Sequence, residues 1–332
     1  MTVAGPFGLA VEDPALEADL RRGLAAVESL LLESVKSDDA FIATAAQHLV
    51  SAGGKRFRPL LVLLAAQFGD PSAPGVVSSA VVVELTHLAT LYHDDVMDEA
   101  PMRRGAPSAN ARWDNTVAIL TGDFLFARAS DLLADLGPEA VRIQARTFER
   151  LVTGQIHETV GAVGGQDAVE HYLSVVADKT GSLIATSGRF GALMSGADDT
   201  VVEVLTHFGE RIGVAFQLSD DLLDVASESA VSGKTPGTDL REGVPTLPVL
   251  HVMASKDPAD AALAALLRSD LTDDAIHAEA LERLRGNPAM QRARDDLSRY
   301  ADSARAVLGP LPGGAARRAL SALCDVVVER VV

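Results

Sequence analysis

Two acidic segments with the same spacing stand out in the sequence. DDVMD, at residues 94–98, and DDLLD, at residues 220–224, each place a third aspartate three positions after an aspartate pair. The other aspartate pairs lack a third aspartate at this spacing; they lie at residues 38–39, 198–199, 273–274 and 295–296. On a helix, carboxylates four positions apart lie on one face at roughly 6 Å, where like charges repel. The pattern therefore calls for a positive charge opposite these carboxylates.

Hard divalent cations meet that requirement. Mg²⁺ prefers oxygen ligands and usually takes one or two carboxylates, with water and substrate phosphates completing its shell. A single aspartate pair is most often a solvated helix end. Both triplets, however, end strongly apolar segments, VVVELTHLATLYHDDVMD and RIGVAFQLSDDLLD. Two such clusters facing each other across a cavity would hold several Mg²⁺ ions, and the ions would hold a polyphosphate.

Basic residues provide candidates for phosphate binding. The segment GGKRFRP contains Lys55, Arg56 and Arg58, and Arg103 and Arg104 follow the first acidic cluster. Arginine binds phosphate as a planar fork, and lysine binds it as a point charge. A basic loop alone is usually solvent-facing. Together with two aspartate triplets, it indicates that acids and bases both face a diphosphate, with metal between them.

Helices must position these residues, because apolar residues recur with helical periodicity and no alternating run predicts a strand convincingly. The acidic clusters fall near the ends of helices predicted at residues 76–99 and 199–228, and GGKRFRP lies in a break between helices. We expect one large all-α domain over residues 1–332. The other predicted helices are 14–36, 39–51, PLLVLLAAQFG, 114–135, 138–160, 167–195 and, beyond the loop SGKTPGTDLREGVP, TLPVLHVMAS and three further stretches.

Composition limits the function classes. Hydrophobic residues make up 48% of the chain but aromatic residues only 4%, so alanine, valine and leucine must fill the core. The net charge of -17 argues against nucleic acid and against stable docking to an anionic membrane. The single Cys324 fits a reducing compartment. The N-terminus does not read as a signal peptide, and no stretch approaches the roughly 20 apolar residues of a membrane span, so we expect a cytoplasmic protein.

The motifs GGKRFRP, HDDVMDEAPMRRG, KTGSL, FQLSDDLLD and GKTPGTDLREG, in this order, closely resemble those of the trans-type polyprenyl diphosphate synthases. The resemblance covers about residues 50–250. It implies an all-α fold of the class I isoprenoid synthase type, with antiparallel helices around a central cavity, acting as a homodimer. It also implies that an allylic diphosphate is condensed repeatedly with isopentenyl diphosphate, each step releasing pyrophosphate.

The resemblance assigns the acidic residues to metal binding, with three Mg²⁺ ions in each active site. Asp94 and Asp98 resemble ligands of two ions, with Asp95 supporting them. Asp220 resembles the ligand of the third ion, to which Asp221 and Asp224 are held through water.

The same resemblance assigns the substrate contacts. Arg103 resembles the arginine that contacts the allylic diphosphate in this family. The clamp for isopentenyl diphosphate comprises Lys55, Arg58, Arg104 and His87. The remaining predicted contacts are Lys179 and Lys234, which reach the allylic diphosphate, and Thr180 and Gln217, which line the reacting carbons; Gln155 and Glu158 face the same region without an assigned role.

One position departs from the family pattern. Many members have DLxEGK where this chain has DLREGV, so the expected lysine is replaced by Val244. One diphosphate contact is then missing or supplied by another residue, for which Arg241 is a candidate. We expect weaker allylic binding rather than loss of activity.

The product length depends on the residues below the first acidic cluster. Ala89 and Thr90 occupy positions where short-chain members of the family have bulky aromatic residues, so the first gate for the growing tail is open. HLATLYHDDVMDE resembles the long-chain, quinone-tail branch. Such products have about seven to ten isoprene units, and helices of about 20 to 30 residues can enclose a tail of roughly 35–40 Å. The stopping residue is not identified; Phe124, Phe126 and Phe148 are candidates.

Three alternatives stay open from the sequence. A shorter-chain farnesyl or geranylgeranyl synthase shares every motif. A class I terpene cyclase shares the first acidic motif but normally has an Asn/Asp-Ser/Thr-Glu site where this chain has DDLLD. A non-catalytic subunit of a heteromeric synthase typically loses the aspartate motifs, and both are intact here.

For a long-chain product we expect transient membrane contact at release.

Overall fold

The computed structural model describes residues 8–9, 11–227 and 236–331. These residues form two compact units, each drawn from three segments of the chain. Unit 1 comprises Met1–Glu149, Leu183–Gly209 and Leu308–Ala322; unit 2 comprises Arg150–Ser182, Glu210–Val307 and Leu323–Val332. The assignment of residues 1–332 to a single domain stays a prediction.

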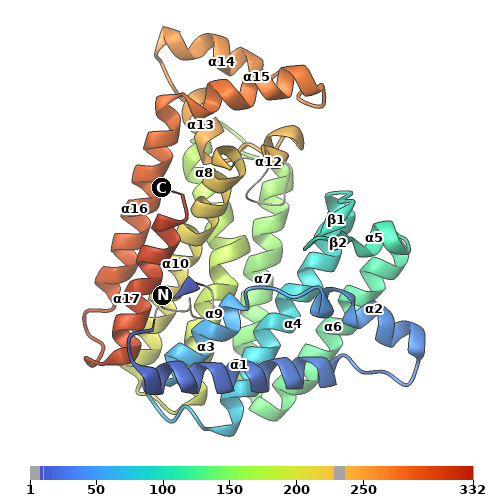
Figure 1. Ribbon diagram of the computed structural model, residues 1–332, viewed down its shortest axis with the longest axis vertical. Helices are drawn as coiled ribbons and strands as arrows, with labels where there is room; N and C mark the ends of the chain where they lie inside the picture. The colour runs from blue at the N-terminus through green and yellow to red at the C-terminus, as the bar shows by residue number, and fades with distance from the viewer. Residues whose placement is uncertain (1–7, 10, 228–235, 332) are drawn as a thin grey trace. The chain divides into compact units, whose positions relative to one another are not determined.

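Helix α4, Pro74–Met97, is the central helix of unit 1. Every residue from Ser79 to Thr86 is buried, as expected of a helix that is apolar on all sides. It lies beside α6 and also contacts α3 and α1 (Figure 1). The other elements with residues in unit 1 are α1 (Pro14–Ser34), α2 (Ala40–Ser51), α3 (Phe57–Ala66), α5 (Ala109–Arg112), α6 (Asn115–Leu136), the beginning of α7 (Pro138–Val160), α9 (Ser182–Met194), and parts of α10 (Asp199–Ala226) and α17 (Ala315–Glu329).

Helix α4 also corrects one statement from the sequence. Among the described helices it is the one long and apolar enough to cross a membrane by length and composition. However, 67% of its most apolar window is buried inside the protein, which is the usual condition of a core helix.

A short hairpin follows α4 and was not predicted. Strands β1 (Met102–Arg103) and β2 (Ala106–Pro107) pair antiparallel, with Met102 opposite Pro107 and Arg103 opposite Ala106. The two connecting residues, Arg104 and Gly105, have φ values of 53° and 77°. Positive φ at both positions is the geometry of a tight hairpin turn. Strands of two residues are too short for an alternating pattern to reveal.

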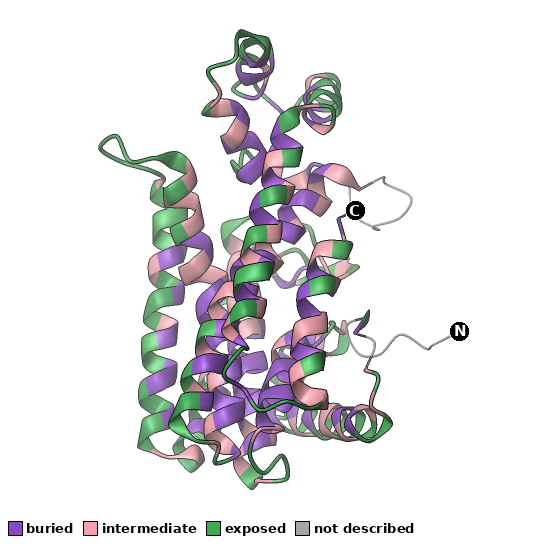
Figure 2. Cartoon of the chain, turned by 90° about the vertical axis from the view of Figure 1, so that its left-hand side faces the viewer, coloured by how far each residue is buried: buried purple, intermediate pink, exposed green. Residues whose placement is uncertain are grey.

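In unit 2, α13 (Leu247–Met253) packs against α16 (Pro288–Val307) and against α8 (Ala168–Val176). Helices α14 (Ala261–Leu266) and α15 (Asp274–Arg285) lie side by side (Figure 1). The unit also contains the ends of α7, α10 and α17, the short helix α12 (Thr238–Arg241) and the 3₁₀ turn η3 (Pro258–Asp260). Figure 2 shows buried residues along one side of most helices and exposed residues along the other.

The helix predicted at residues 167–195 is interrupted. Between α8 and α9, residues Ala177–Gly181 form a single π-helical turn, η2. A π turn changes which residues face the core without ending the helix, so apolar periodicity does not reveal it. The predicted all-α class is nevertheless confirmed.

Candidate active site

The first acidic motif ends α4, and its three aspartates differ in environment. Asp95 is fully buried and accepts a hydrogen bond from Arg103 Nε at 2.5 Å. Asp98 is half-exposed, with its Oδ2 3.7 Å from Arg103 Nη2. Burial raises the pKa of Asp95, and the Arg103 charge partly offsets this. Asp94, in the last turn, is partly exposed. Asp95 is the most buried of the three, and the division into two outer ligands and a supporting Asp95 stays a prediction.

The second acidic motif lies near the end of α10, in unit 2. Asp221 is buried and accepts hydrogen bonds from the Tyr172 hydroxyl and from Gln217 Nε2, the latter at 3.0 Å. Burial raises the pKa of Asp221 to about 6. Asp220 is more exposed and accepts from Arg330 Nη2 at 2.6 Å. Tyr172 and Arg330 were not anticipated, because neither belongs to a recognisable motif.

Asp224 binds the backbone of the following loop. Its Oδ1 accepts from the N–H of Thr238 at 3.1 Å, and its Oδ2 accepts from the N–H of Asp239 at 3.2 Å. Both N–H groups belong to the first turn of α12, where backbone donors lack helical partners. Asp224 therefore anchors α12 as well as being a predicted metal residue.

The donor chemistry of both motifs fits hard divalent cations. In the described parts of the chain, no three His, Cys, Asp or Glu side chains lie close enough to hold a metal as they stand. However, Asp95 Oδ2 is buried and lacks a hydrogen-bond partner within the described structure, although a buried carboxylate oxygen normally has one. The first motif thus presents an unsatisfied hard ligand. That the two motifs face one cavity stays a prediction.

The other aspartate pairs have local structural roles. Asp39 and Asp273 cap α2 and α15 by accepting hydrogen bonds from first-turn N–H groups. Asp198 accepts from the N–H of Val201 at the start of α10. Asp296 pairs with His251 Nε2 at 2.7 Å. The distinction drawn from spacing therefore separates capping and packing residues from the two triplets.

The predicted isopentenyl diphosphate clamp comes together in unit 1. His87 lies on α4, close enough to Arg58, Arg104 and Arg103 for their charges to act on it. Burial, followed by these positive charges, lowers the pKa of His87 well below its usual value. The imidazole is then neutral beside a concentrated positive charge, which favours binding of an anion. Lys55 is exposed in the adjoining loop.

The hairpin and the basic loop are held together by Arg104. Its Nη1 donates to the carbonyl oxygen of Gly53 and, at 3.3 Å, to that of Leu49. A Cβ on Gly54 would lie 3.0 Å from Arg104 Nη1, so glycine permits this close approach. The GGKRFRP and MRRG segments, far apart in the sequence, thus contact each other through Arg104.

Four predicted residues of unit 2 are also connected or paired. Thr180 Oγ1, on the π turn η2, donates to Gln217 Oε1 at 3.0 Å, and Gln217 in turn donates to Asp221. Lys179, on the same turn, lies 2.5 Å from Glu158 Oε2. Glu158, which had no assigned role, is therefore the partner of Lys179.

Three predicted positions lie in α12 or close to it in the sequence. Lys234 lies outside the described residues. Val244 is 37% exposed, as expected of an unpaired surface position. Arg241 pairs with Asp274 at 2.9 Å and donates to the carbonyl of Thr272, so it is tied to α15 and does not replace the missing lysine in this arrangement.

The chain-length positions lie between α4 and α6. Ala89 is fully buried, and a Cβ on Gly122 of α6 would lie 3.1 Å from the Ala89 carbonyl oxygen. Thr90 Oγ1 donates to the carbonyl of His87. Tyr92 donates to the carbonyl of Ala45 in α2, so its ring does not occupy the position of a gate. Among the candidate stopping residues, Phe126 and Phe148 contact each other, with centroids 4.5 Å apart.

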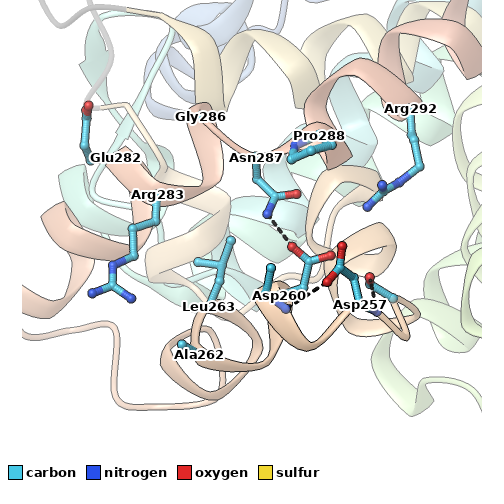
Figure 3. Close-up of a pocket in the computed structure, with 12 residues that line it drawn as sticks. Asp257, Asp260, Ala262, Leu263, Glu282, Arg283, Gly286, Asn287, Pro288 and Arg292 are labelled. Atoms are coloured by element: carbon cyan, nitrogen blue, oxygen red, sulfur yellow. Dashed lines mark hydrogen bonds between the residues drawn. The ribbon is translucent and has the colours of Figure 1, made fainter.

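A cavity of about 460 Å³ in unit 2 is separate from these residues (Figure 3). Its buried polar groups have structural partners: Asn287 Nδ2 donates to Asp260 Oδ1 at 2.7 Å, and Asn287 Oδ1 accepts from the N–H of Ala289. Asp257 caps the turn η3. None of the predicted site residues lines this cavity, so it is not the candidate active site.

Two long helices of this all-α fold end in aspartate triplets, and in unit 1 a basic cluster surrounds a neutral histidine on α4. These are side chains that an enzyme acting on diphosphates needs. The family model described as polyprenyl synthetase matches residues 39–284, and the chain belongs to that family. It is therefore a transferase of prenyl groups, as the motifs predicted.

Individual relatives agree with this assignment. A nonaprenyl diphosphate synthase of Mycobacterium tuberculosis is 52% identical over 324 residues, covering 97% of each chain. The crystal structure of a geranylgeranyl pyrophosphate synthase from Corynebacterium glutamicum, complexed with calcium and isoprenyl diphosphate, matches with a TM-score of 0.87 and 46% identity, covering 97% of this chain and 99% of that one. A decaprenyl diphosphate synthase from Rhodobacter capsulatus matches with a TM-score of 0.87 and 36% identity over 96% and 99% of the two chains.

Proposed function

We propose that this enzyme condenses an allylic diphosphate with successive isopentenyl diphosphates to a long-chain all-trans polyprenyl diphosphate. The observation that carries the proposal is the juxtaposition at one end of α4. There, a neutral His87 lies among Arg58, Arg103 and Arg104, and the first aspartate triplet lies about two to three turns further along the helix. Two diphosphate groups require this combination of cationic side chains and metal ligands.

Each residue group has a defined task in the proposed reaction. Lys55, Arg58, Arg104 and His87 bind isopentenyl diphosphate and hold its alkene toward the allylic carbon. Arg103 and Lys179 stabilise the departing pyrophosphate. Mg²⁺ held by the aspartates would supply the remaining charge that makes pyrophosphate an adequate leaving group. Thr180 and Gln217 line the reacting carbons and help exclude water from the allylic cation.

The bond changes balance without a side-chain base. The allylic C–O bond breaks heterolytically, because the resulting cation is delocalised over three carbons. The isopentenyl alkene then forms the new C–C bond and loses a proton. Released pyrophosphate is the base in this proposal, since no side chain then needs to enter the site to take the proton.

A long-chain product is supported by the names of two similar proteins and by the small residue at the gate. The relatives described as nonaprenyl and decaprenyl diphosphate synthases are 52% and 36% identical to this chain. Ala89 has no aromatic ring to limit the tail. A shorter product is the second candidate, because a geranylgeranyl pyrophosphate synthase is also similar to this chain.

We further propose three Mg²⁺ ions per active site, a homodimer, a cytoplasmic location and transient membrane contact when the product leaves. The Corynebacterium glutamicum structure, a complex with calcium and isoprenyl diphosphate, supports a divalent cation together with a diphosphate in a similar protein. The dimer is supported by apolar residues on α6, where Ile119 is 43% exposed and Leu120 is 61% exposed.

One assay tests the function and separates the alternatives. The purified chain is incubated with radiolabelled isopentenyl diphosphate, Mg²⁺ and farnesyl, geranyl or geranylgeranyl diphosphate, and products are sized by chromatography. We expect label in long polyprenyl products and none after chelation. Incorporation that resists chelator would refute the mechanism. A cyclase would leave isopentenyl diphosphate unused, and a non-catalytic subunit would show no turnover alone.

A further inference from the structure

Arg56 differs from the other basic residues of its loop because its side chain points into the protein. The residue is only 8% exposed, whereas the neighbouring Lys55 is exposed. Arg56 has a φ of 50°, in the left-handed region that is uncommon for residues with a side chain. A backbone held in this conformation requires compensating contacts.

Those contacts come from three helices of unit 1. Arg56 Nη1 donates to Glu84 Oε1 of α4 at 2.8 Å, and Glu84 is itself only 2% exposed. Arg56 Nε and Nη2 donate to the two carboxylate oxygens of Glu28 on α1. Nη2 also donates to the carbonyl oxygen of Val50, near the end of α2, at 3.1 Å. All three guanidinium nitrogens are thus engaged by the protein.

The arrangement links the loop to the predicted isopentenyl diphosphate clamp. Glu84 lies three positions before His87 on α4, so the two side chains share a helix face. Arg56 lies between Lys55 and Arg58 in the sequence, and fixing its side chain limits where both neighbours can reach. Arg104 holds the same loop through the Gly53 carbonyl. The loop is therefore fixed both at Gly53 and at Arg56.

We propose that Arg56, with Glu84 and Glu28, is a positioning residue that holds the GGKRFRP loop so that Lys55 and Arg58 meet isopentenyl diphosphate. Arg56 touches no substrate in this role. The inference rests on the proposed function, because it assigns the purpose of the network to the binding of that substrate. The buried Glu84 carboxylate, the one acid in the run VVVELTH, is the sequence signal that marks it.

Kinetics of Arg56→Met test the proposal. We expect KM for isopentenyl diphosphate to rise about tenfold or more, while KM for the allylic primer and kcat change less than about threefold, the separation expected when one binding site is disturbed. Arg56→Lys, which can keep one bond to Glu84, should rescue part of the loss. Leu133→Ala, in the core of unit 1 on α6, is the control for general destabilisation.

Two further measurements do not depend on turnover. Calorimetric titration with isopentenyl diphosphate alone should show weaker binding to Arg56→Met. Limited trypsin digestion should cleave faster after Lys55 in that variant, because the loop is released. In a double-mutant cycle, Glu84→Gln added to Arg56→Met should have little further effect on KM, since the two residues act as one unit.

The possible outcomes separate the hypotheses. If Arg56→Met leaves KM for isopentenyl diphosphate unchanged, or raises both KM values as Leu133→Ala does, the positioning role is wrong. If KM rises but trypsin sensitivity stays that of the wild type, Arg56 is a direct ligand and the proposal also fails. If Arg56→Met does not fold, Arg56→Lys and Glu28→Gln carry the same test. A wild-type enzyme that ignores isopentenyl diphosphate would refute the proposed function itself.

Discussion

At the scale of single residues, the two acidic motifs share a division of labour. In each, the second aspartate is buried and hydrogen-bonded: Asp95 accepts from Arg103, and Asp221 accepts from Tyr172 and Gln217. The first and last aspartates are more exposed. The outer carboxylates also have partners in the protein: Asp220 pairs with Arg330, and Asp224 accepts from backbone N–H groups of α12.

Asp221 provides a prediction about stability and pH. Its folded-state pKa is about 6, above the value of about 3.9 expected in an unfolded chain. Because the folded protein holds the Asp221 proton more tightly than the unfolded chain, this group's contribution to stability is fully present below about pH 4. The contribution is lost as the pH rises through 6. At pH 7.5 the ionised, metal-free group therefore destabilises the fold, by at most about 3 kcal/mol.

Asp221→Asn should consequently raise the free energy of unfolding of the metal-free protein by about 1–3 kcal/mol at pH 7.5 and have little effect near pH 4. Urea denaturation in chelator at both pH values measures this. Asp220→Asn, at a more exposed position paired with Arg330, is the control and should not stabilise. A destabilised Asp221→Asn at pH 7.5 would contradict the interpretation.

At the scale of elements, the π turn η2 is held in place by a close contact with α7. A Cβ added to Gly154 would lie 2.6 Å from the backbone nitrogen of Lys179. The glycine therefore lets α7 approach the turn that presents Lys179 and Thr180. The need for a glycine at position 154 cannot be predicted from the local sequence, because the contact joins residues 25 positions apart.

Gly154→Ala should displace η2, destabilise the protein by about 1–3 kcal/mol and lower kcat by roughly tenfold. Thermal unfolding and steady-state kinetics measure the two effects. Gly313→Ala is a suitable control, because its added Cβ would meet no atom within 4 Å. Wild-type kcat in Gly154→Ala would show that the position of the turn does not matter for catalysis.

The product-length prediction also belongs to this scale, since it concerns the space beside α4. Ala89→Phe would add a ring at a fully buried position next to α6, and we expect products shortened by several isoprene units. Reversed-phase chromatography of dephosphorylated products measures the length. Ala89→Leu is a milder variant in case the phenylalanine disturbs folding. Unchanged product lengths in a folded variant would refute the gate argument.

At the scale of the whole molecule, charge and surface composition set the context of the site. The net charge is -17, yet four arginines lie around His87. Cationic side chains are therefore concentrated beside His87 despite the negative net charge. An anionic substrate is attracted only close to the site, which favours small diphosphates over polyanions such as nucleic acid.

The proposed dimer gives a prediction for the assembly. Leu120→Glu places a charge on the exposed apolar face of α6 and should convert a dimer to a monomer. Size-exclusion chromatography with light scattering measures the mass. Leu32→Glu, at a 43% exposed position on α1, is the matched control and should stay dimeric. A monomeric wild-type protein, or a dimeric Leu120→Glu, would exclude an interface at this face.

Much of the fold and site was predictable from the sequence. The all-α class follows from apolar periodicity, which depends only on spacing along the chain. The two aspartate triplets and the GGKRFRP and MRRG segments could be chosen because helix geometry and phosphate chemistry restrict what such spacings do, whereas His87 was chosen only through the family resemblance. The supporting role of Asp95 came from the same resemblance and stays a prediction.

Only the tertiary structure decided which charges are satisfied by the protein and which are left for a ligand. In the sequence, Arg56 is indistinguishable from the other basic residues of its loop; the structure shows that it pairs with Glu84 and Glu28. Tyr172 beside Asp221, the hairpin that carries Arg104, and the π turn at Lys179 likewise depend on contacts between distant segments. Local sequence determines helix periodicity, but the partner of a buried charge depends on long-range packing, which no short segment encodes.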